Sequence, residues 1–283
     1  QEDGNLAWAV NLGAGANYFY PMLGESLAQA VYSPERAVIA GNSTPSGTLQ
    51  PLSDGRYLVR GRWDGCTGAD WATTFTATVR CLDEQGSETG DRRAVVLAPG
   101  QVRLHRAWRA MGLRHSASYT IETEGASIDA PHIFELGRFK QTPPTPFYRF
   151  PFVSFARLSF AACVLGMARA FLDEGRRFLE EKARASGHRK TAPFQQLEAS
   201  EGQLQAAKET FFQALDTSWA LHLQLGNLPD ATKQILDHHS FAGTHAALSS
   251  ADRLFPWLGM AAVDTGHRLN HIWRDLHTGA QHG

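Results

Sequence analysis

The chain has 283 residues, a length that suits about two domains. Hydrophobic residues make up 43% and charged residues 19%, so the chain can bury a sizeable core and is not a disordered protein. Its 27 Lys and Arg balance 28 Asp and Glu, and the absence of a basic excess argues against nucleic acid and anionic membranes as partners.

The cysteines indicate the cellular compartment. Cys66, Cys81 and Cys163 are odd in number, lie far apart and form no C-x-x-C pair. This pattern argues against a disulfide framework or a zinc site, and it favours the reducing cytoplasm.

No segment predicts a membrane span. The most apolar helix-length stretch, residues 152–172, carries Arg157 and Arg169, whereas a spanning helix needs about 20 nearly uncharged residues. The start of the chain shows no signal-peptide pattern. Because the chain opens at Gln1 within an apolar pattern, we expect it to be a piece of a longer protein.

The pattern along the chain changes twice. Residues 1–33 have the apolar spacing of helices, residues 34–140 have the alternation and glycine turns of β-structure, and residues 141–151 form a stiff, proline-rich linker. The strands expected are 56–63, 71–79, 93–98, 102–108 and 118–128. The helices expected after the linker are 152–185, 194–225, 229–249 and 262–280.

These elements predict an α+β multidomain fold. It would consist of a remnant of an N-terminal helical domain (1–33), a middle β-barrel-like domain (34–140) and a C-terminal four-helix bundle (141–283). The expected helix 194–225 is apolar over much of its surface, so we expect it to form an interface, in a homotetramer or at least a dimer. Its apolar residues are Leu197, Leu204, Phe211, Phe212, Leu215, Trp219 and Leu223.

Three strings resemble the acyl-CoA dehydrogenase superfamily. Residues 41–79 (GNSTPSGTLQPLSDGRYLVRGRWDGCTGADWATTFTATV) resemble its middle domain, in which a G-G-Y-x-x-x-G-x-W strand precedes a Ser-Gly turn and a Trp-bearing strand. Residues 112–119 (GLRHSASY) are similar to its G-x-R-x-(S/T)-x-S-Y turn, and residues 274–282 (RDLHTGAQH) to its C-terminal R-D helix. The resemblance covers the chain from about residue 34 to its end, together with a fragment before it.

The end of the chain indicates the branch of the superfamily. Dehydrogenases carry a catalytic Glu in a Y-E-G string after the R-D pair, whereas this chain has His282 and Gly283 there. A His at this position resembles the oxygenase components of two-component flavin-dependent monooxygenases. In that branch a separate reductase supplies reduced flavin, which reacts with oxygen to give a C4a-hydroperoxide that oxygenates an aromatic substrate.

The resemblance implies a role for His282 as acid, base or substrate-orienting group. Imidazole has an ordinary pKa of about 6.5, so it can accept a proton from a substrate hydroxyl near neutral pH. His277, one turn earlier, is the next candidate, and we expect it to be a solvated helix residue.

The resemblance also implies flavin contacts in the β-domain. Thr67 and Gly68 match the Ser-Gly turn, which would place the Thr67 hydroxyl near flavin N5, where it would also act in catalysis. Trp71 and Thr73 match the strand that lies along the flavin ring. The residues that match a segment at the pyrimidine edge are Asn42, Ser43 and Thr44.

A basic run between two expected helices is a further candidate for cofactor binding. In dehydrogenases this connection carries an Arg-x-x-Phe-Gly string that reaches the flavin pyrophosphate of a neighbouring subunit. Arg184, Arg189 and Lys190 keep the basic character, but the Gly after Phe194 is missing. Guanidinium and ammonium groups are natural phosphate ligands.

The substrate class follows only from the resemblance, and the sequence does not separate FMN from FAD. Several aromatic residues could line an aromatic pocket or belong to the core: Trp8, Tyr18, Phe19, Tyr20, Phe147 and Tyr148. The twelve histidines do not predict a metal site, because His267 and His271 share a helix face without a third ligand at metal-site spacing.

Two other functions remain open at this point. The first is an acyl-CoA dehydrogenase or oxidase, against which the missing Glu counts. The second is a flavin-free paralogue that serves as a scaffold. We expect an enzyme that uses reduced flavin and oxygen, in the cytoplasm, without nucleic acid or membrane partners.

Overall fold

The computed structural model describes residues 3–282, which group into two units. The helical unit contains the chain up to Asn11, residues 110–113 and everything from Phe150 onward, whereas the sheet unit contains residues 12–109 and 114–149. The expected N-terminal part is thus divided, because residues 12–33 group with the sheet. The division into three domains stays a prediction.

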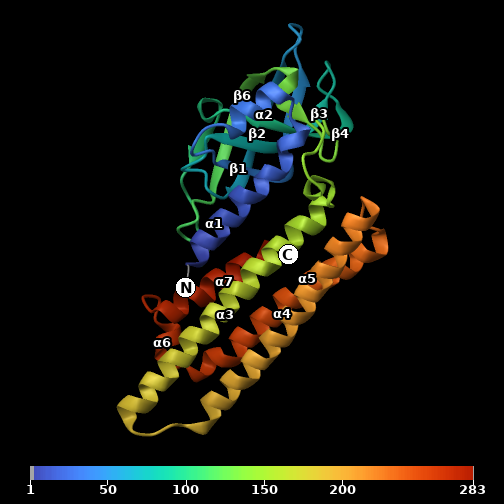
Figure 1. The fold of residues 1–283 in the computed structure, drawn as a ribbon. Helices are drawn as coiled ribbons and strands as arrows, with labels where there is room; N and C mark the ends of the chain where they lie inside the picture. Colours follow the sequence, from blue (N-terminus) through green and yellow to red (C-terminus); the bar gives the residue numbers. More distant parts are fainter. Residues whose placement is uncertain (1–2, 283) are drawn as a thin grey trace. The chain divides into compact units, whose positions relative to one another are not determined.

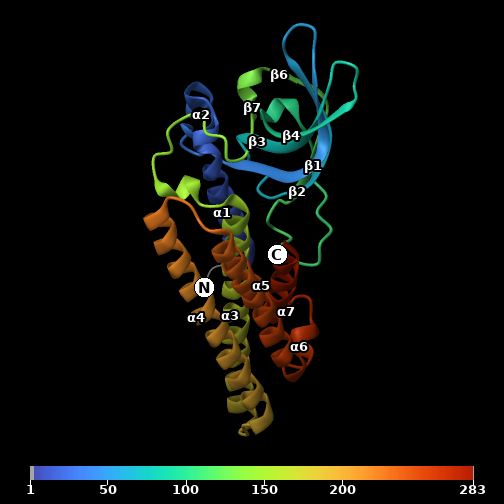
Figure 2. The same ribbon diagram turned by 90° about the vertical axis from the view of Figure 1, so that its right-hand side faces the viewer.

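The sheet unit is built around one seven-stranded sheet with the order β5-β6-β2-β1-β3-β4-β7 (Figure 1). All of its strand pairs are antiparallel except β1 with β3. In Figure 2 the strands curl around a common interior, as expected for a barrel-like domain. The strands are β1 (Ile39–Pro51), β2 (Tyr57–Cys66), β3 (Thr74–Leu82), β4 (Glu88–Leu97), β5 (Arg103–His105), β6 (Tyr119–Ile128) and β7 (Ile133–Phe134).

The sheet interior follows from alternation along the strands. In β2, Val59 and Trp63 are buried while the residues next to them are more exposed, as a period of two requires. The pairing with β6 shifts register between Trp63 and Cys66, and this shift brings Cys66 to the buried side as well. Burial raises the pKa of the Cys66 thiol to about 12, so it remains a neutral core group. The Trp63 indole N–H donates to the Thr78 carbonyl at 2.8 Å, which satisfies its polar atom inside the core.

The expected strands differ from the structure at several places: β4 begins at Glu88 instead of residue 93, β5 is limited to Arg103–His105, and β7 was not expected. Strand β3 begins at Thr74, so the predicted start at residue 71 is wrong. The sequence analysis also assigned no strand to β1, because its string of Gly, Ser, Thr and Pro is typical of a loop. Glycine is required there by close approach, since a Cβ on Gly41 would lie 2.1 Å from the Thr76 carbonyl oxygen and one on Gly47 2.2 Å from the Trp63 ring.

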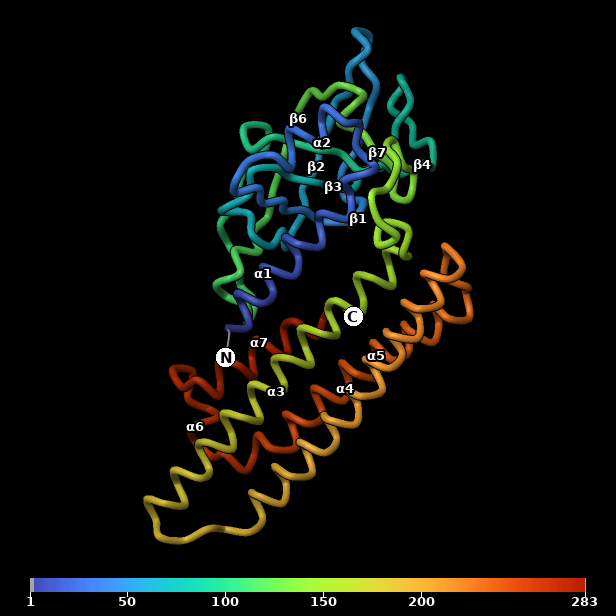
Figure 3. The backbone as a smooth tube through the Cα atoms, viewed as in Figure 1, coloured from blue at the N-terminus to red at the C-terminus, as the bar shows by residue number. Residues whose placement is uncertain are grey.

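The helical unit contains the four predicted bundle helices, but the fourth is shorter than expected, because residues 264–267 interrupt the predicted helix 262–280. Figure 3 shows α3, α4 and α5 running side by side with α7 along α3, and the contacts between these elements agree. The main helices of this unit are α3 (Phe152–Ser186), α4 (Thr191–Leu225), α5 (Asp230–Leu254), α6 (Met260–Val263) and α7 (Arg268–Gly279). The N-terminal helices are α1 (Gly4–Gly15), which starts in this unit, and α2 (Glu25–Tyr32) of the sheet unit.

Helix α3 is the central helix of the bundle. Its buried residues recur at helical spacing, and it contacts α4, α5 and α7. By length and composition α3 could cross a membrane, so the expectation that no segment qualifies is wrong on those two criteria. One such helix is weak evidence, because the core helix of a globular bundle has the same composition.

A buried carboxylate ties α7 to two other segments of the helical unit. Asp275 accepts hydrogen bonds from the Leu113 N–H at 2.5 Å and from the Asn5 side-chain amide at 3.0 Å. Burial raises the pKa of Asp275, while the bond from Leu113 favours its charged form. Asp275 thus holds both α1 and residues 110–113 against α7.

We expect Gly112→Ala to destabilise the protein. A Cβ at Gly112 would lie 2.1 Å from the Arg274 carbonyl oxygen, so α7 and this segment would have to separate. The expected loss in the free energy of unfolding is about 2–3 kcal/mol, measured by denaturant unfolding followed by circular dichroism. The matched control is Gly202→Ala in α4, where a Cβ meets no atom within 4 Å and stability should rise by up to about 1 kcal/mol. Equal midpoints for both variants would contradict the close approach.

Candidate functional site

The candidate site in the sheet unit is the turn between β2 and β3. Thr67 begins this turn and is 6% exposed, whereas Trp71 ends it and is 57% exposed. The Trp71 N–H donates to the Gly68 carbonyl at 3.0 Å, and Gly68 has a φ of +80°, which an L-residue rarely adopts. The turn therefore presents a large exposed indole beside a nearly buried hydroxyl.

Residues 116–118 hold this turn in place. The Gly68 N–H donates to the Ser116 carbonyl at 3.0 Å, and the Ala69 N–H donates to the Ala117 carbonyl at 3.1 Å. The Thr67 and Ser118 hydroxyls share a third hydrogen bond of 2.8 Å. An exposed aromatic ring on a turn held in this way loses little conformational freedom when it binds a ligand.

An ion pair lies beside the exposed indole. The Arg106 guanidinium donates to the Asp70 carboxylate at 2.6 Å. Tyr119 also faces this carboxylate, and desolvation together with the negative charge of Asp70 raises the pKa of its hydroxyl. Because the pair is largely exposed, its contribution to stability is small. It orients Asp70 and places a cation next to the turn.

Asn42, Ser43 and Thr44 lie in an irregular part of β1. The pairing with β3 shifts register between Asn42 and Gly47, and the Asn42 side chain stabilises this bulge. Its amide nitrogen donates to the Asp64 carbonyl at 2.6 Å, and its amide oxygen accepts from the Thr44 N–H at 2.6 Å. Ser43 and Thr44 remain exposed.

The same residues connect the bulge to the turn. The Asp64 carboxylate accepts a hydrogen bond from the Thr120 hydroxyl at 2.6 Å, two residues after Ser118. Asn42 thus contacts the end of β2 at Asp64, three residues before Thr67, although 25 positions separate Asn42 from Thr67 in the sequence.

Thr73 does not lie on a strand, contrary to the sequence analysis. It precedes β3, so the expected period-two relation to Trp71 does not apply. Its hydroxyl donates to the Val38 carbonyl and accepts from the Val38 N–H, both at 3.1 Å. These two bonds tie the start of β3 to the residue before β1 and leave the hydroxyl one remaining lone pair.

His282 lies in the helical unit, at the end of a short 3-10 turn after α7. Its ring lies 4.8 Å from the Trp8 ring and 5.7 Å from the Phe160 ring, and these two aromatic rings stack on each other at 5.3 Å between centroids. Desolvation lowers the pKa of His282 below its ordinary 6.5, and hydrogen bonds to the preceding backbone only partly oppose this. The residue still reaches the surface, so its neutral imidazole is accessible as a proton acceptor.

His277 is not the solvated residue that the sequence analysis expected. It is half-buried, and its Nε2 lies 2.9 Å from the Asp252 carboxylate, which also accepts from the Trp273 indole N–H at 2.9 Å. The His277 and Trp273 rings are 4.1 Å apart. His277 therefore serves to attach α7 to α5.

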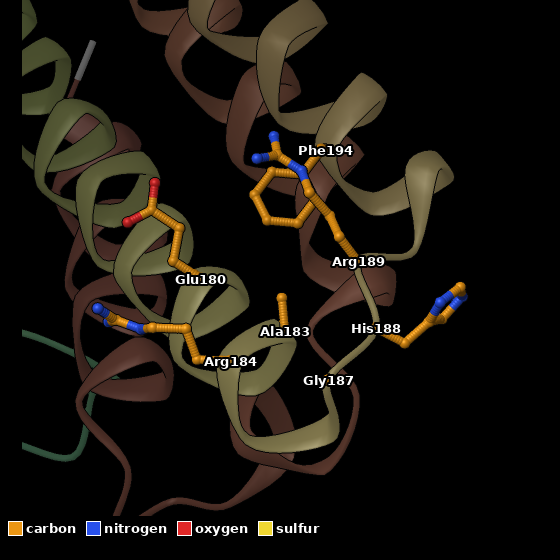
Figure 4. Close-up of a pocket in the computed structure, with 7 residues that line it drawn as sticks. All are labelled: Glu180, Ala183, Arg184, Gly187, His188, Arg189 and Phe194. Carbon is orange, nitrogen blue, oxygen red and sulfur yellow. The ribbon is translucent and has the colours of Figure 1, made fainter.

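The basic run forms an open cavity of about 480 Å³ at the α3–α4 connection (Figure 4). The Arg189 guanidinium lies 3.7 Å above the centre of the Phe194 ring, a cation–π contact that fixes its position. Arg184 also lines the cavity, whereas Lys190 stands just before α4 and is not part of its lining. The lining residues are Glu180, Ala183, Arg184, Gly187, His188, Arg189 and Phe194.

The aromatic residues that the sequence left open divide between the units. Tyr18 is buried and packs against Phe19, Phe147 and Tyr148, which makes this group a core cluster in the sheet unit. Trp8 instead belongs to the helical unit, against His282.

The residues of the turn fit a planar heteroaromatic cofactor such as a flavin. The exposed face of Trp71 suits a flat ring, and the Thr67 hydroxyl makes one hydrogen bond among the described residues, which leaves it capacity for a ligand. The arginines at the α3–α4 connection suit a phosphate group. The candidate cofactor residues thus form one set in each unit.

The sequence analysis did not assign the residues that support the site. Ser116 and Ser118 stood in the quoted string at 112–119 and Asp275 in the R-D pair, but neither string indicated a partner. The hydrogen-bond partners of Thr67 and Leu113 lie in distant segments of the chain, so a local sequence pattern does not identify them. The one available indication was that two serines, Ser116 and Ser118, stand two residues apart in this string.

Comparison with known proteins identifies relatives over the whole chain. Residues 158–283 match the family described as acyl-CoA dehydrogenase, C-terminal domain. The indole-3-acetate monooxygenase of Acinetobacter baumannii is 26% identical over 99% of this chain and 72% of its own length. The oxygenase subunit HsaA of a flavin-dependent monooxygenase from Rhodococcus jostii is 23% identical over 99% of this chain and 76% of its own.

A solved structure with the same fold agrees with these relatives. XiaF from Streptomyces, in complex with FADH2 and glycerol, superposes with a TM-score of 0.86 at 18% identity, over 99% of this chain and 73% of that one. The predicted fold is confirmed: the chain has the acyl-CoA dehydrogenase fold. The match at residues 158–283 and the names of the two relatives agree with the predicted resemblance to the acyl-CoA dehydrogenase superfamily and to flavin-dependent monooxygenases.

We expect Trp71→Ala to weaken the binding of reduced flavin by about 1–3 kcal/mol, because it removes a large apolar contact. Stability should change little, since the side chain is mostly exposed. Anaerobic titration and thermal unfolding measure the two effects. Trp63→Phe is the matched control: Trp63 is 1% exposed and hydrogen-bonded, so its replacement should lower stability more than flavin affinity. Equal losses of affinity and stability in Trp71→Ala would make Trp71 an ordinary structural residue.

Proposed function

We propose that this chain, whose residues 158–283 belong to the acyl-CoA dehydrogenase C-terminal domain family, is the oxygenase component of a two-component flavin-dependent monooxygenase. It would hydroxylate a small aromatic substrate with oxygen and reduced flavin, FMN or FAD. The printed names of its relatives, an indole-3-acetate monooxygenase and a flavin-dependent monooxygenase subunit, support this reaction class.

The observation that carries the proposal is the turn at residues 67–71. An exposed tryptophan held by three hydrogen bonds from residues 116–118, beside a hydroxyl with unused capacity, suits a flat ring with a polar edge. Trp71 would lie against the flavin ring and Thr67 near N5. The side-chain amide of Asn42 is already hydrogen-bonded within the β1 bulge, so Asn42 would fix the backbone beside the pyrimidine edge of the flavin. Ser43 and Thr44 would contact that edge directly.

Bound reduced flavin would supply the electrons that activate oxygen. The chain's own residues would orient the ring, limit access of water and handle the substrate's proton. In the sheet unit the exposed indole of Trp71 provides apolar surface, which disfavours water-promoted loss of hydrogen peroxide.

His282 would accept the proton of the substrate hydroxyl or orient that hydroxyl. The desolvation that lowers its pKa keeps the imidazole neutral at neutral pH, and a neutral ring is the form that accepts a proton. The Trp8 and Phe160 rings restrict its orientation.

The basic cavity would bind the phosphate end of a flavin held by a neighbouring subunit. Arg184 and Arg189 are exposed cations, and Arg189 is pre-positioned by Phe194. Lys190 would add charge beside the start of α4, where the helix dipole also favours an anion.

We propose a homotetramer assembled through the helical unit. In α4, Leu197, Leu204 and Phe211 are buried in the bundle, whereas Phe212 and Leu223 are exposed. Helix α5, which packs against α4, also carries exposed apolar residues, Ile235 and Phe241, and exposed apolar patches mark interfaces. The remaining partners would be a separate flavin reductase and a small aromatic molecule, in the cytoplasm.

The first test follows product. The chain is mixed with anaerobically reduced flavin and then with oxygen and an aromatic substrate such as indole-3-acetate, and hydroxylated product is measured. Reduction of a stably bound flavin by an acyl-CoA would instead indicate a dehydrogenase. The absence of flavin binding in either redox state would indicate a scaffold.

We expect His282→Ala to reduce hydroxylation about 10²–10⁴-fold while flavin binding and fold remain intact. Peroxide release should rise as product falls, because oxygen is still reduced. In the wild type the rate should rise with pH as the imidazole loses its proton. Because desolvation lowers the pKa of His282, the midpoint of this pH dependence should lie below 6.5. The pH dependence should disappear in His282→Ala.

His277→Ala serves as the control for this prediction. It removes the contact with Asp252, so stability should fall, but the pH midpoint of hydroxylation should stay unchanged. Hydroxylation by His282→Ala at the wild-type rate would exclude the proposed role of His282.

We expect light scattering at micromolar concentration to give the mass of a tetramer, or at least of a dimer. Replacing both Phe212 and Leu223 by Ser should shift the protein to a smaller species, because burial of these side chains would be lost. Met260→Ser, at a residue of α6 that is 77% exposed, should leave the mass unchanged. A monomeric wild type would contradict the proposed assembly.

A further inference from the structure

Three hydroxyl groups form a buried row behind the turn at residues 67–71. The Thr67 and Ser118 oxygens are 2.8 Å apart, and the Ser118 and Ser116 oxygens are 2.6 Å apart. The exposed fraction rises along the row, from 0% at Ser116 through 2% at Ser118 to 6% at Thr67. Thr67 is therefore the end that a ligand can reach, and the two serines lie behind it.

The backbone is shaped to make this row. Ser116 and Ser118 are two positions apart, and in an extended strand such side chains share a face without touching. Ala117 between them has a φ of +49°, a conformation that costs free energy in a residue other than glycine. This bend allows the two serine hydroxyls to meet, and the Ala117 carbonyl accepts the Tyr119 N–H at 2.9 Å.

The row can be hydrogen-bonded in either direction. In each pair either oxygen can be the donor, and a hydroxyl donates one proton and accepts at two lone pairs. When Thr67 donates to Ser118 and Ser118 to Ser116, Thr67 presents lone pairs to a ligand. When the direction is reversed, Thr67 presents its proton.

Flavin N5 requires both of these arrangements. In reduced flavin N5 carries a hydrogen and donates, whereas in oxidised flavin N5 has a lone pair and accepts. A single fixed hydroxyl suits one of these states, and a row that reverses by rotation of its hydroxyls suits both without moving a heavy atom.

We propose that Ser118 and Ser116 are positioning residues that set the hydrogen-bond direction of Thr67, so that Thr67 accepts from N5 of reduced flavin and donates to N5 of oxidised flavin. The inference rests on the proposed flavin site at Thr67. Without Ser118 the Thr67 proton has no acceptor in the row. The affinity for reduced flavin then falls most, because the Thr67 proton and the N5 hydrogen point toward each other.

The test compares the dissociation constants of oxidised and anaerobically reduced flavin, with FMN and with FAD as probes. In Ser118→Ala, the preference for reduced over oxidised flavin should fall about 3- to 10-fold, the range of one net hydrogen bond. Ser118→Thr, which keeps a hydroxyl, should restore most of the preference. Ser116→Ala provides a second variant, with a smaller change in the same direction.

A double-mutant comparison separates the row from a general packing effect. In a Thr67→Val background, Ser118→Ala should no longer change the preference, because the group that it orients is absent. An unchanged preference in Ser118→Ala, or an equal change with and without the Thr67 hydroxyl, overturns the inference while the proposed function stands. A wild-type chain that binds neither redox state of flavin overturns the proposed function and this inference with it.

Discussion

The candidate site depends on the hydrogen bonds between the turn at residues 67–71 and residues 116–118. An exposed tryptophan binds a flat ring well only if its backbone is already fixed, because ordering it at the moment of binding would cost conformational entropy. Two backbone bonds and one hydroxyl pair fix this turn, and Gly68 has the positive φ that the turn requires. The polar groups of Asn42, Asp64 and Thr120 extend the same arrangement to the β1 bulge.

The helical unit has a corresponding constraint at Asp275. Its carboxylate satisfies the buried Leu113 N–H and the Asn5 amide, so α7 is attached at a defined position. His282 lies in the short 3-10 turn that follows α7, next to the rings of Trp8 and Phe160, and burial there lowers its pKa. A carboxylate that is committed to structural bonds in this way is not available as a catalytic base, which agrees with assigning proton transfer to an imidazole.

The hydrogen bonds of Asp275 and those of the turn at residues 67–71 both involve the segment 113–118. Residues 110–113 belong to the helical unit, and residues 114–149 belong to the sheet unit. Leu113 is bound by Asp275, and Ser116 and Ala117 hold the turn that carries Trp71. Two residues in this stretch, Leu113 and Ala117, have positive φ without being glycine. Strain of this kind is concentrated at functional sites because the surrounding contacts are strong enough to maintain it.

The sequence by itself determined the order of most elements, the helices of the bundle and the resemblance to the acyl-CoA dehydrogenase superfamily. Apolar spacing in α3 and alternation in β2 are local patterns, and the strings around residues 41–79 and 274–282 carry the resemblance without any tertiary contact. Strand β1 could not be predicted, because its glycines are required by close contacts with Thr76 and Trp63, which lie far away in the sequence. Only the tertiary structure decided that Trp71 stands on a turn, that His277 is committed to Asp252 and that Ser116 and Ser118 lie behind Thr67. The physical reason is that hydrogen bonds and burial depend on which distant segments meet, and a local pattern contains no information on that meeting.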